Sequence, residues 1–125
     1  MKQEFLDYIW DLFNNARKAI VFVSSMTYSD FERDEKTQYA VVRALEIMGE
    51  AAKKVPGEIK MAYPEIPWRE ISGMRDKLIH DYTGVNLMVI WRTLQQDLPP
   101  LIQHLKRLLS DYGEMSDESE QQRQA

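Results

Sequence analysis

One apolar stripe near the C-terminal end constrains the fold of this chain more than any other feature. Its members step by four and three residues in strict alternation: Leu87, Trp91, Leu94, Leu98, Leu101, Leu105 and Leu108. This heptad spacing is typical of a helix that packs along one face. The stripe predicts a long helix that begins near Asn86, a good N-cap residue, with a kink at Pro99-Pro100.

The remaining sequence repeats at helical spacing as well. Apolar residues at three- and four-residue steps predict a first helix over roughly residues 2–25 and a second over residues 35–55. The stretch 27–34 between them breaks the pattern and predicts a short turn, and residues 58–63 predict a further turn or short helix.

A further helix is expected to begin between Pro67 and Ser72 and to end at Gly84, with Ile71, Met74 and Leu78 on its buried side. No stretch shows strand-like alternation. The sequence therefore predicts an all-α up-and-down bundle of four to five helices over residues 1–110. The polar residues 111–125 are expected to form a disordered tail.

Composition narrows the possible classes of function. The chain has 125 residues, of which 44% are hydrophobic and 29% charged, which suits one soluble domain. It has no cysteine and only two histidines, so we expect no disulfide, no metal site and no cofactor. The lack of cysteine, of a signal peptide and of a long apolar run predicts a cytoplasmic protein without a membrane span.

The formal net charge of -4 gives no support for non-specific binding to nucleic acid, which relies on many cations. Any activity on nucleic acid must therefore come from a local site. The only dense cluster of reactive side chains is RDKLIHDY, residues 75–82, which has the form R-x4-H-x-Y.

This motif and its context resemble the HepT-like branch of the HEPN superfamily. The segment DFERDEKTQYAVVRALEIMGEAAKKVP, residues 30–56, looks like the second helix of that family. The segment YPEIPWREISGMRDKLIHDYTGVNLMVIWRTLQQDLPPLI, residues 63–102, looks like its motif helix and last helix. A bare R-x4-H is a weak signal, but the motif within this long context is specific.

The resemblance implies a metal-independent RNase that acts as the toxin of a bacterial toxin–antitoxin pair. It implies a homodimer that brings two motif helices together, and a nucleotidyltransferase antitoxin of the MNT type as partner. It also implies catalytic roles for Arg75 and His80, and a regulatory role for Tyr82, which the partner would convert to O-AMP-tyrosine. This sequence keeps the family pattern at all three positions.

The residue types suit cleavage of RNA without a metal. Histidine can act as a base toward the ribose 2′-OH or as an acid toward the leaving oxygen, because its pKa lies near neutral pH. An arginine guanidinium can hold phosphate oxygens in a fork. Asp76 stands four residues before His80, so on a helix it could orient the imidazole.

Helix geometry adds a constraint on how the two catalytic residues can meet. Positions 75 and 80 lie about 140° apart around a helix axis. Three solutions remain open: Arg75 reaches around the helix, the turn before Gly84 unwinds, or a second protomer completes the site.

Each of these signals also has an ordinary structural explanation. Arg75 could pair with Asp76 or Glu70, Tyr82 could flank the core, and His104 is expected to be a solvated surface residue. Arg43, Glu46 and Glu50 share one face of the second helix, where they either line the cleft opposite the motif or form an exposed ion-pair face.

Three functions fit the sequence. The first is an RNase toxin. The second is a catalytically silent HEPN domain that binds and regulates a nucleotidyltransferase. The third is a helical homo-oligomer with a structural role, in which the apolar stripe forms part of the interface.

Overall fold

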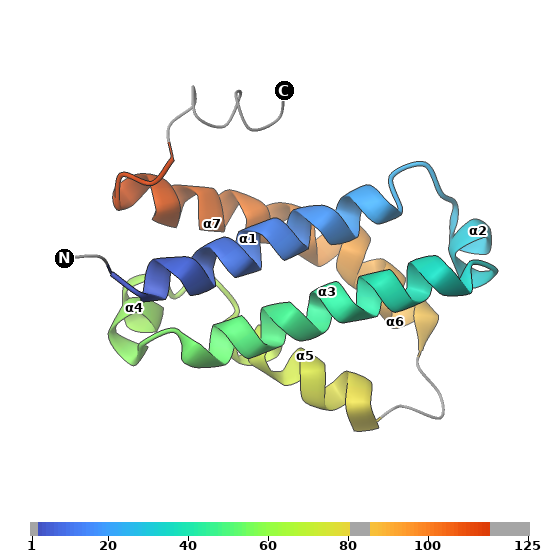
Figure 1. Ribbon diagram of the computed structural model, residues 1–125, viewed down its shortest axis with the longest axis horizontal. Helices are drawn as coiled ribbons and strands as arrows, with labels where there is room; N and C mark the ends of the chain where they lie inside the picture. The colour runs from blue at the N-terminus through green and yellow to red at the C-terminus, as the bar shows by residue number, and fades with distance from the viewer. Residues whose placement is uncertain (1–2, 81–85, 116–125) are drawn as a thin grey trace.

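A computed structural model gives the arrangement of the chain (Figure 1). It describes residues 3–80 and 86–115, with the backbone alone at positions 75 and 77–80. The described residues form helices and turns without a strand, as the periodicity predicts. In chain order the elements are α1 (Phe5–Phe22), α2 (Tyr28–Glu32), α3 (Glu35–Lys54), α4 (Gly57–Ala62), α5 (Trp68–His80), α6 (Leu87–Arg92), the π-helical turn η1 (Thr93–Asp97) and α7 (Leu98–Asp111).

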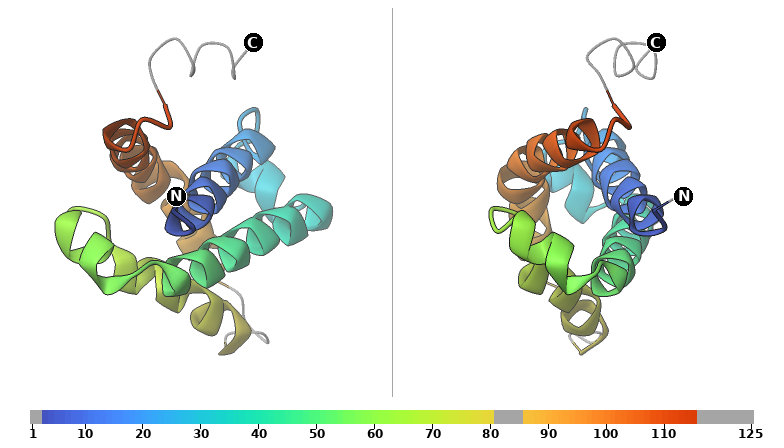
Figure 2. Two further views of the ribbon diagram at one scale, coloured as in Figure 1. Left: turned by 60° about the vertical axis from the view of Figure 1, so that its left-hand side comes forward. Right: turned by 90° about the vertical axis from the view of Figure 1, so that its left-hand side faces the viewer.

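Helix α1 lies between its neighbours and organises the bundle. It packs against α3 on one side and against α7 on the other, and α3 in turn packs against α5 (Figures 1 and 2). The buried face of α1 includes Ile9, Leu12, Phe13 and Ala16, at the three- and four-residue steps that place side chains on one side of a helix. Burial of one large apolar side chain contributes about 1.5–3 kcal/mol, so this face supplies much of the core.

The segment after α1 is more ordered than the predicted turn. Thr27 caps the short helix α2: its hydroxyl accepts from the Asp30 N–H at 3.1 Å, and the Asp30 carboxylate accepts from the Thr27 N–H at 3.0 Å. Such a reciprocal cap satisfies two backbone donors at the start of a helix. Phe31 follows on the buried side, and its ring lies 5.5 Å from that of Trp91 on α6.

The long C-terminal helix deforms one turn earlier than Pro99-Pro100, where the kink is predicted. The Leu98 N–H donates to the Thr93 carbonyl, five residues back, which defines the π-helical turn η1. Prolines at 99 and 100 lack the N–H groups that would bond to residues 95 and 96, and their rings would crowd those carbonyls in a regular helix. Widening the preceding turn relieves this conflict. The stripe itself is confirmed, since its five leucines from Leu94 onward are all buried.

Packing continues past residue 110, where the apolar pattern ends, as far as Met115, the last residue that the structure describes. Gly113, at φ 73°, ends α7: its N–H donates to the Ser110 carbonyl at 3.0 Å, and the Glu114 N–H donates to the Leu109 carbonyl at 2.8 Å. This is a Schellman cap, which needs a left-handed residue. Met115 is buried. The packing past residue 110 follows from this local cap, which heptad spacing does not encode.

Over residues 3–80 and 86–115, none of the helices combines the length and the apolar character needed to cross a membrane.

Candidate active site and the groove beside it

Positions 75–80 of the motif lie on α5, whose first turn is fixed firmly to the rest of the bundle. Trp68 opens the helix with a buried ring, and its indole N–H donates to the Tyr63 carbonyl at 3.0 Å. Ile71, one turn later, is buried as well. The Ile71 N–H donates to the Pro67 carbonyl at 3.0 Å, which starts the helical ladder directly after the two prolines of this loop.

Two side-chain contacts tie the loop before α5 to α7. The Tyr63 hydroxyl donates to the Asp111 carboxylate at 2.7 Å, and the Arg107 guanidinium lies 3.3 Å from the Glu65 carboxylate. Burial of the phenol raises the pKa of Tyr63 to about 12, and the hydrogen bond and the negative charge of Asp111 act in the same direction. The start of α5 is therefore held at a fixed place relative to α7.

The predicted catalytic positions 75 and 80 both lie within α5, and Tyr82 and Gly84 lie outside the described residues. The helix remains α-helical through His80. The separation of about 140° between positions 75 and 80 therefore holds along this helix. Residues 68–80 are not unwound, but the turn before Gly84 lies outside the described residues, so all three solutions to the mismatch stay open.

Asp76 lies close to a lysine of α3. Its carboxylate is 3.6 Å from the Lys53 ammonium, and the two side chains are 60% and 41% exposed. Exposed ion pairs contribute little to stability. The pair nevertheless defines which flank of α3 faces α5, and it gives Asp76 a partner other than the one that the helix spacing suggests.

The acidic residues of α3 continue along that flank. Glu46 and Glu50 precede Lys53 by seven and three residues, so all three share one face of the helix. Glu46 and Glu50 are half-buried, whereas Arg43 is exposed. Helix α5 runs antiparallel to α3 (Figure 1).

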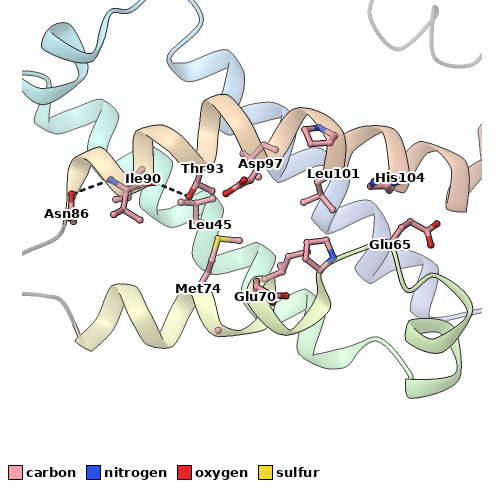
Figure 3. A pocket seen from close by; sticks show the side chains of 16 residues that line it. Leu45, Glu65, Glu70, Met74, Asn86, Ile90, Thr93, Asp97, Leu101 and His104 are labelled. Atoms are coloured by element: carbon pink, nitrogen blue, oxygen red, sulfur yellow. Dashed lines mark hydrogen bonds between the residues drawn. The ribbon is translucent and has the colours of Figure 1, made fainter.

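A groove of about 730 Å³ runs along the other side of α5, which we call the α5 groove (Figure 3). One wall is α5 with Glu70, Ile71, Gly73 and Met74, and Leu45 of α3 lies between the walls. The opposite wall comes from α6, η1 and α7: Asn86, Val89, Ile90, Thr93, Asp97, Leu98, Pro100, Leu101 and His104. Arg43, Glu46 and Glu50 do not line it.

The groove was not evident from the sequence, and it corrects one expectation. His104 is half-buried at one end of the groove and not a fully solvated residue. The sequence feature that could have predicted this partial burial is the position of His104 three residues after Leu101, at the edge of the apolar stripe. Over the described residues, no group of three or more His, Asp or Glu side chains is arranged to hold a metal ion.

Comparisons with known proteins bear on this helix and its surroundings. The family model described as "Ribonuclease HepT-like" matches residues 12–108. A protein of Thermococcus cleftensis named "Probable ribonuclease HepT" is 48% identical over 101 residues, which are 81% of this chain and 92% of that protein.

Two further relatives cover similar shares. One from Methanocaldococcus jannaschii is 36% identical over 113 residues, 90% of this chain and 97% of its own length. One from Caldanaerobacter subterraneus subsp. tengcongensis is 40% identical over 102 residues, which are 82% of this chain and 91% of that protein. Both are named "Putative RNase". No solved structure matches the chain significantly. The family match spans α3, α5 and α7, the helices that position the motif, and the chain therefore belongs to the HepT-like ribonucleases of the HEPN superfamily.

Proposed function

We propose that this protein is a metal-independent endoribonuclease and the toxin of a toxin–antitoxin pair, with Arg75 and His80 as its catalytic residues. The observation that carries the proposal is the family match over residues 12–108, which contains R-x4-H-x-Y at residues 75–82. Relatives of which the match covers 92% and 97% are named "Probable ribonuclease HepT" and "Putative RNase", which supports the same activity for this chain.

The proposed reaction is attack of a ribose 2′-OH on the adjacent phosphate, which forms a 2′,3′-cyclic phosphate and breaks the bond to the 5′-oxygen of the next nucleotide. His80 removes or donates a proton at the reacting oxygens, and the Arg75 guanidinium stabilises the charge on the phosphate. Asp76 acts as a positioning residue for His80 in this scheme, in competition with Lys53, which lies 3.6 Å from its carboxylate. Arg43, Glu46 and Glu50, which share one face of α3, are the residues of that helix proposed to line the cleft.

The active form is proposed to be a homodimer in which the two α5 helices lie near the twofold axis. The helical geometry supports this arrangement, because positions 75 and 80 face different directions on a helix that stays regular through His80. A twofold axis can bring position 75 of one protomer to position 80 of its partner.

Regulation is proposed to act on Tyr82, two residues past His80. A partner nucleotidyltransferase of the MNT type would transfer AMP from ATP to the phenol oxygen, with release of pyrophosphate. The new phosphodiester carries about one negative charge beside Arg75 and His80. It would compete with RNA for the guanidinium, so inhibition needs no change of fold.

The nuclease proposal is tested by RNA cleavage and toxicity in bacteria with Arg75→Ala and His80→Ala. Each change should lower the cleavage rate by about 10²–10⁴-fold. Arg69→Ala, an exposed arginine on the same helix, and His104→Ala, the other histidine, are matched controls that should cleave normally. Cleavage that needs added magnesium, or that survives His80→Ala, would overturn the mechanism.

The regulatory proposal is tested by intact mass after co-expression with the neighbouring nucleotidyltransferase. Mass should rise by whole AMP units, map to Tyr82 and vanish in Tyr82→Phe, whereas Tyr39→Phe, at a 69% exposed tyrosine, should leave the modification unchanged. A fully neutralised complex with unmodified Tyr82 would mean that the partner inhibits by binding alone. A protein that is inactive without its partner and yet binds it would instead be a silent HEPN domain.

A further inference from the structure

The α5 groove is elongated, which limits what could fill it. Asn86 lies at one end, and Glu65 and His104 lie at the other (Figure 3). Asn86 and His104 are joined by α6, η1 and α7, and at 1.5 Å per residue this wall is about 27 Å long. A rod-shaped occupant, such as a helix, matches this length better than a compact small molecule.

The walls of the groove are apolar and helical. Ile71 and Met74 line the α5 wall, and Val89, Ile90, Leu98 and Leu101 line the opposite wall. Over the described residues, α5 packs extensively on α3 and not on α6 or α7, so the two walls stay apart. Two helical walls over an apolar base form the kind of groove that receives the apolar face of an amphipathic helix.

The π-helical turn marks the middle of one wall. Thr93 and Asp97, its first and last residues, both line the groove. The turn brings the exposed Asp97 carboxylate to this wall, while the exposed Glu70 carboxylate lies on the α5 wall (Figure 3).

Both carboxylates are available to an incoming cation. Among the described residues, no cation forms an ion pair with Glu70 or Asp97, whereas Glu65 at the end of the groove is paired with Arg107 at 3.3 Å. The chain as a whole carries a net charge of -4. A second copy would bring like charge to this acidic rim, and a basic partner would bring opposite charge.

We propose that the α5 groove binds a helix of another protein that has apolar residues along one face and Lys or Arg on both flanks. The cations on the two flanks would pair with Glu70 and Asp97, and the apolar face would contact Met74 and Val89. This proposal does not rest on the nuclease proposal, because it concerns the flank of α5 opposite to the Lys53–Asp76 pair.

The test uses two labelled helical peptides of about 18 residues, which match the length of the groove. Both carry leucine at heptad positions a and d; one has lysine and the other has glutamate at e and g. Fluorescence anisotropy measures their binding to the wild type, to Glu70→Lys/Asp97→Lys, and to Asp11→Lys/Glu58→Lys. The last variant makes the same change of charge at two exposed acids away from the groove.

The lysine peptide should bind the wild type and the control variant alike, and bind Glu70→Lys/Asp97→Lys about tenfold more weakly. The glutamate peptide should show the reverse preference. Met74→Glu should also weaken binding of the lysine peptide, and circular dichroism checks that this variant keeps its fold. All four positions of the charge variants are exposed, so these variants keep the core intact.

Equal binding of the lysine peptide to all three proteins would overturn the proposal. A half-peptide of about nine residues that binds as tightly as the full one would also overturn it, since it would indicate that a compact ligand suffices. If Met74→Glu turns a dimer of the wild type into monomers in light scattering, a second copy occupies the groove, and the proposal is equally wrong.

Discussion

The hydroxyl of Tyr63 donates a 2.7 Å hydrogen bond to the carboxylate of Asp111, and this contact joins the loop before α5 to the last turn of α7. The two residues are 48 positions apart in sequence. Together with Arg107 and Glu65, they hold the start of the motif helix at the far end of the α5 groove from Asn86. The position of α5 therefore depends on a contact that lies well away from the motif.

The first prediction concerns this hydrogen bond. Tyr63→Phe should lower the free energy of unfolding at neutral pH by about 1 kcal/mol, because the acceptor Asp111 is exposed and can bind water instead. The measurement is urea denaturation followed by circular dichroism, with the exposed Tyr39→Phe as control. Equal stability of Tyr63→Phe and the wild type would show that the bond contributes nothing net.

The second prediction concerns how the difference in unfolding free energy between the wild type and Tyr63→Phe depends on pH. The pKa of Tyr63 rises from 10.0 to about 12 in the folded protein, so folding favours the neutral phenol. Its contribution is fully present below pH 10 and is lost as the pH rises toward 12. The stability difference between the wild type and Tyr63→Phe should therefore shrink over this window. A difference that grows above pH 10 would contradict the assigned sign.

Two glycines should respond to alanine in opposite directions. Gly113→Ala should destabilise the protein by about 1 kcal/mol, because residue 113 sits at φ 73°, where a Cβ is strained. Gly73 is in mid-helix with nothing within 4 Å of an added Cβ, so Gly73→Ala should stabilise it by about 0.5–1 kcal/mol. Thermal unfolding of the two variants measures both effects, and a shared sign would contradict the reasoning.

Helical period explains why so much of the fold is readable from the sequence. The leucines of the C-terminal stripe, from Leu94 to Leu108, are buried as their spacing predicts, and α3 ends within one residue of the expected stop. The features that the sequence did not predict arise from local hydrogen bonding, which the spacing of apolar residues does not encode. The reciprocal cap of Thr27 starts the short helix α2 where a turn is predicted. The C-terminal helix deforms in η1, one turn before the prolines at which the kink is predicted.

The candidate site is less readable than the fold, because it depends on distances between helices. Helix spacing alone pairs Asp76 with His80, but tertiary packing brings Lys53 of α3 to the same carboxylate. His104 belongs to a groove only because α5 stands apart from α7, and no local pattern reports that separation. The motif itself is read from residue types, and its function needs the comparison with relatives.

The competing contacts of Asp76 give a further prediction. If Asp76 positions the imidazole, Asp76→Asn should slow cleavage and shift the pH profile of kcat, because an amide stabilises the imidazolium less than a carboxylate does. Lys53→Met removes only the 3.6 Å ion pair with Asp76. It should leave the pH profile of kcat unchanged or raise the apparent pKa of the His80 imidazole in that profile, because Asp76 is then free to stabilise the imidazolium. Identical pH profiles for Asp76→Asn and the wild type would assign Asp76 to the ion pair alone.

Mixing two inactive proteins tests whether the active site is shared between protomers. On a helix that is regular through His80, positions 75 and 80 point about 140° apart, so a shared site would take Arg75 from one protomer and His80 from its partner. In a mixed dimer of Arg75→Ala and His80→Ala, one site then holds both substitutions and the other holds none.

Random exchange of equal amounts makes about half of the dimers mixed, and each of these has one intact site of two. The mixture should therefore recover about one quarter of the wild-type cleavage activity, measured after co-refolding, while each variant alone stays inactive. The same mixture made from Arg75→Ala and the double variant Arg75→Ala/His80→Ala is the matched control and should stay inactive, because it contains no intact Arg75. Recovery near zero in the first mixture would mean that both residues act from the same protomer.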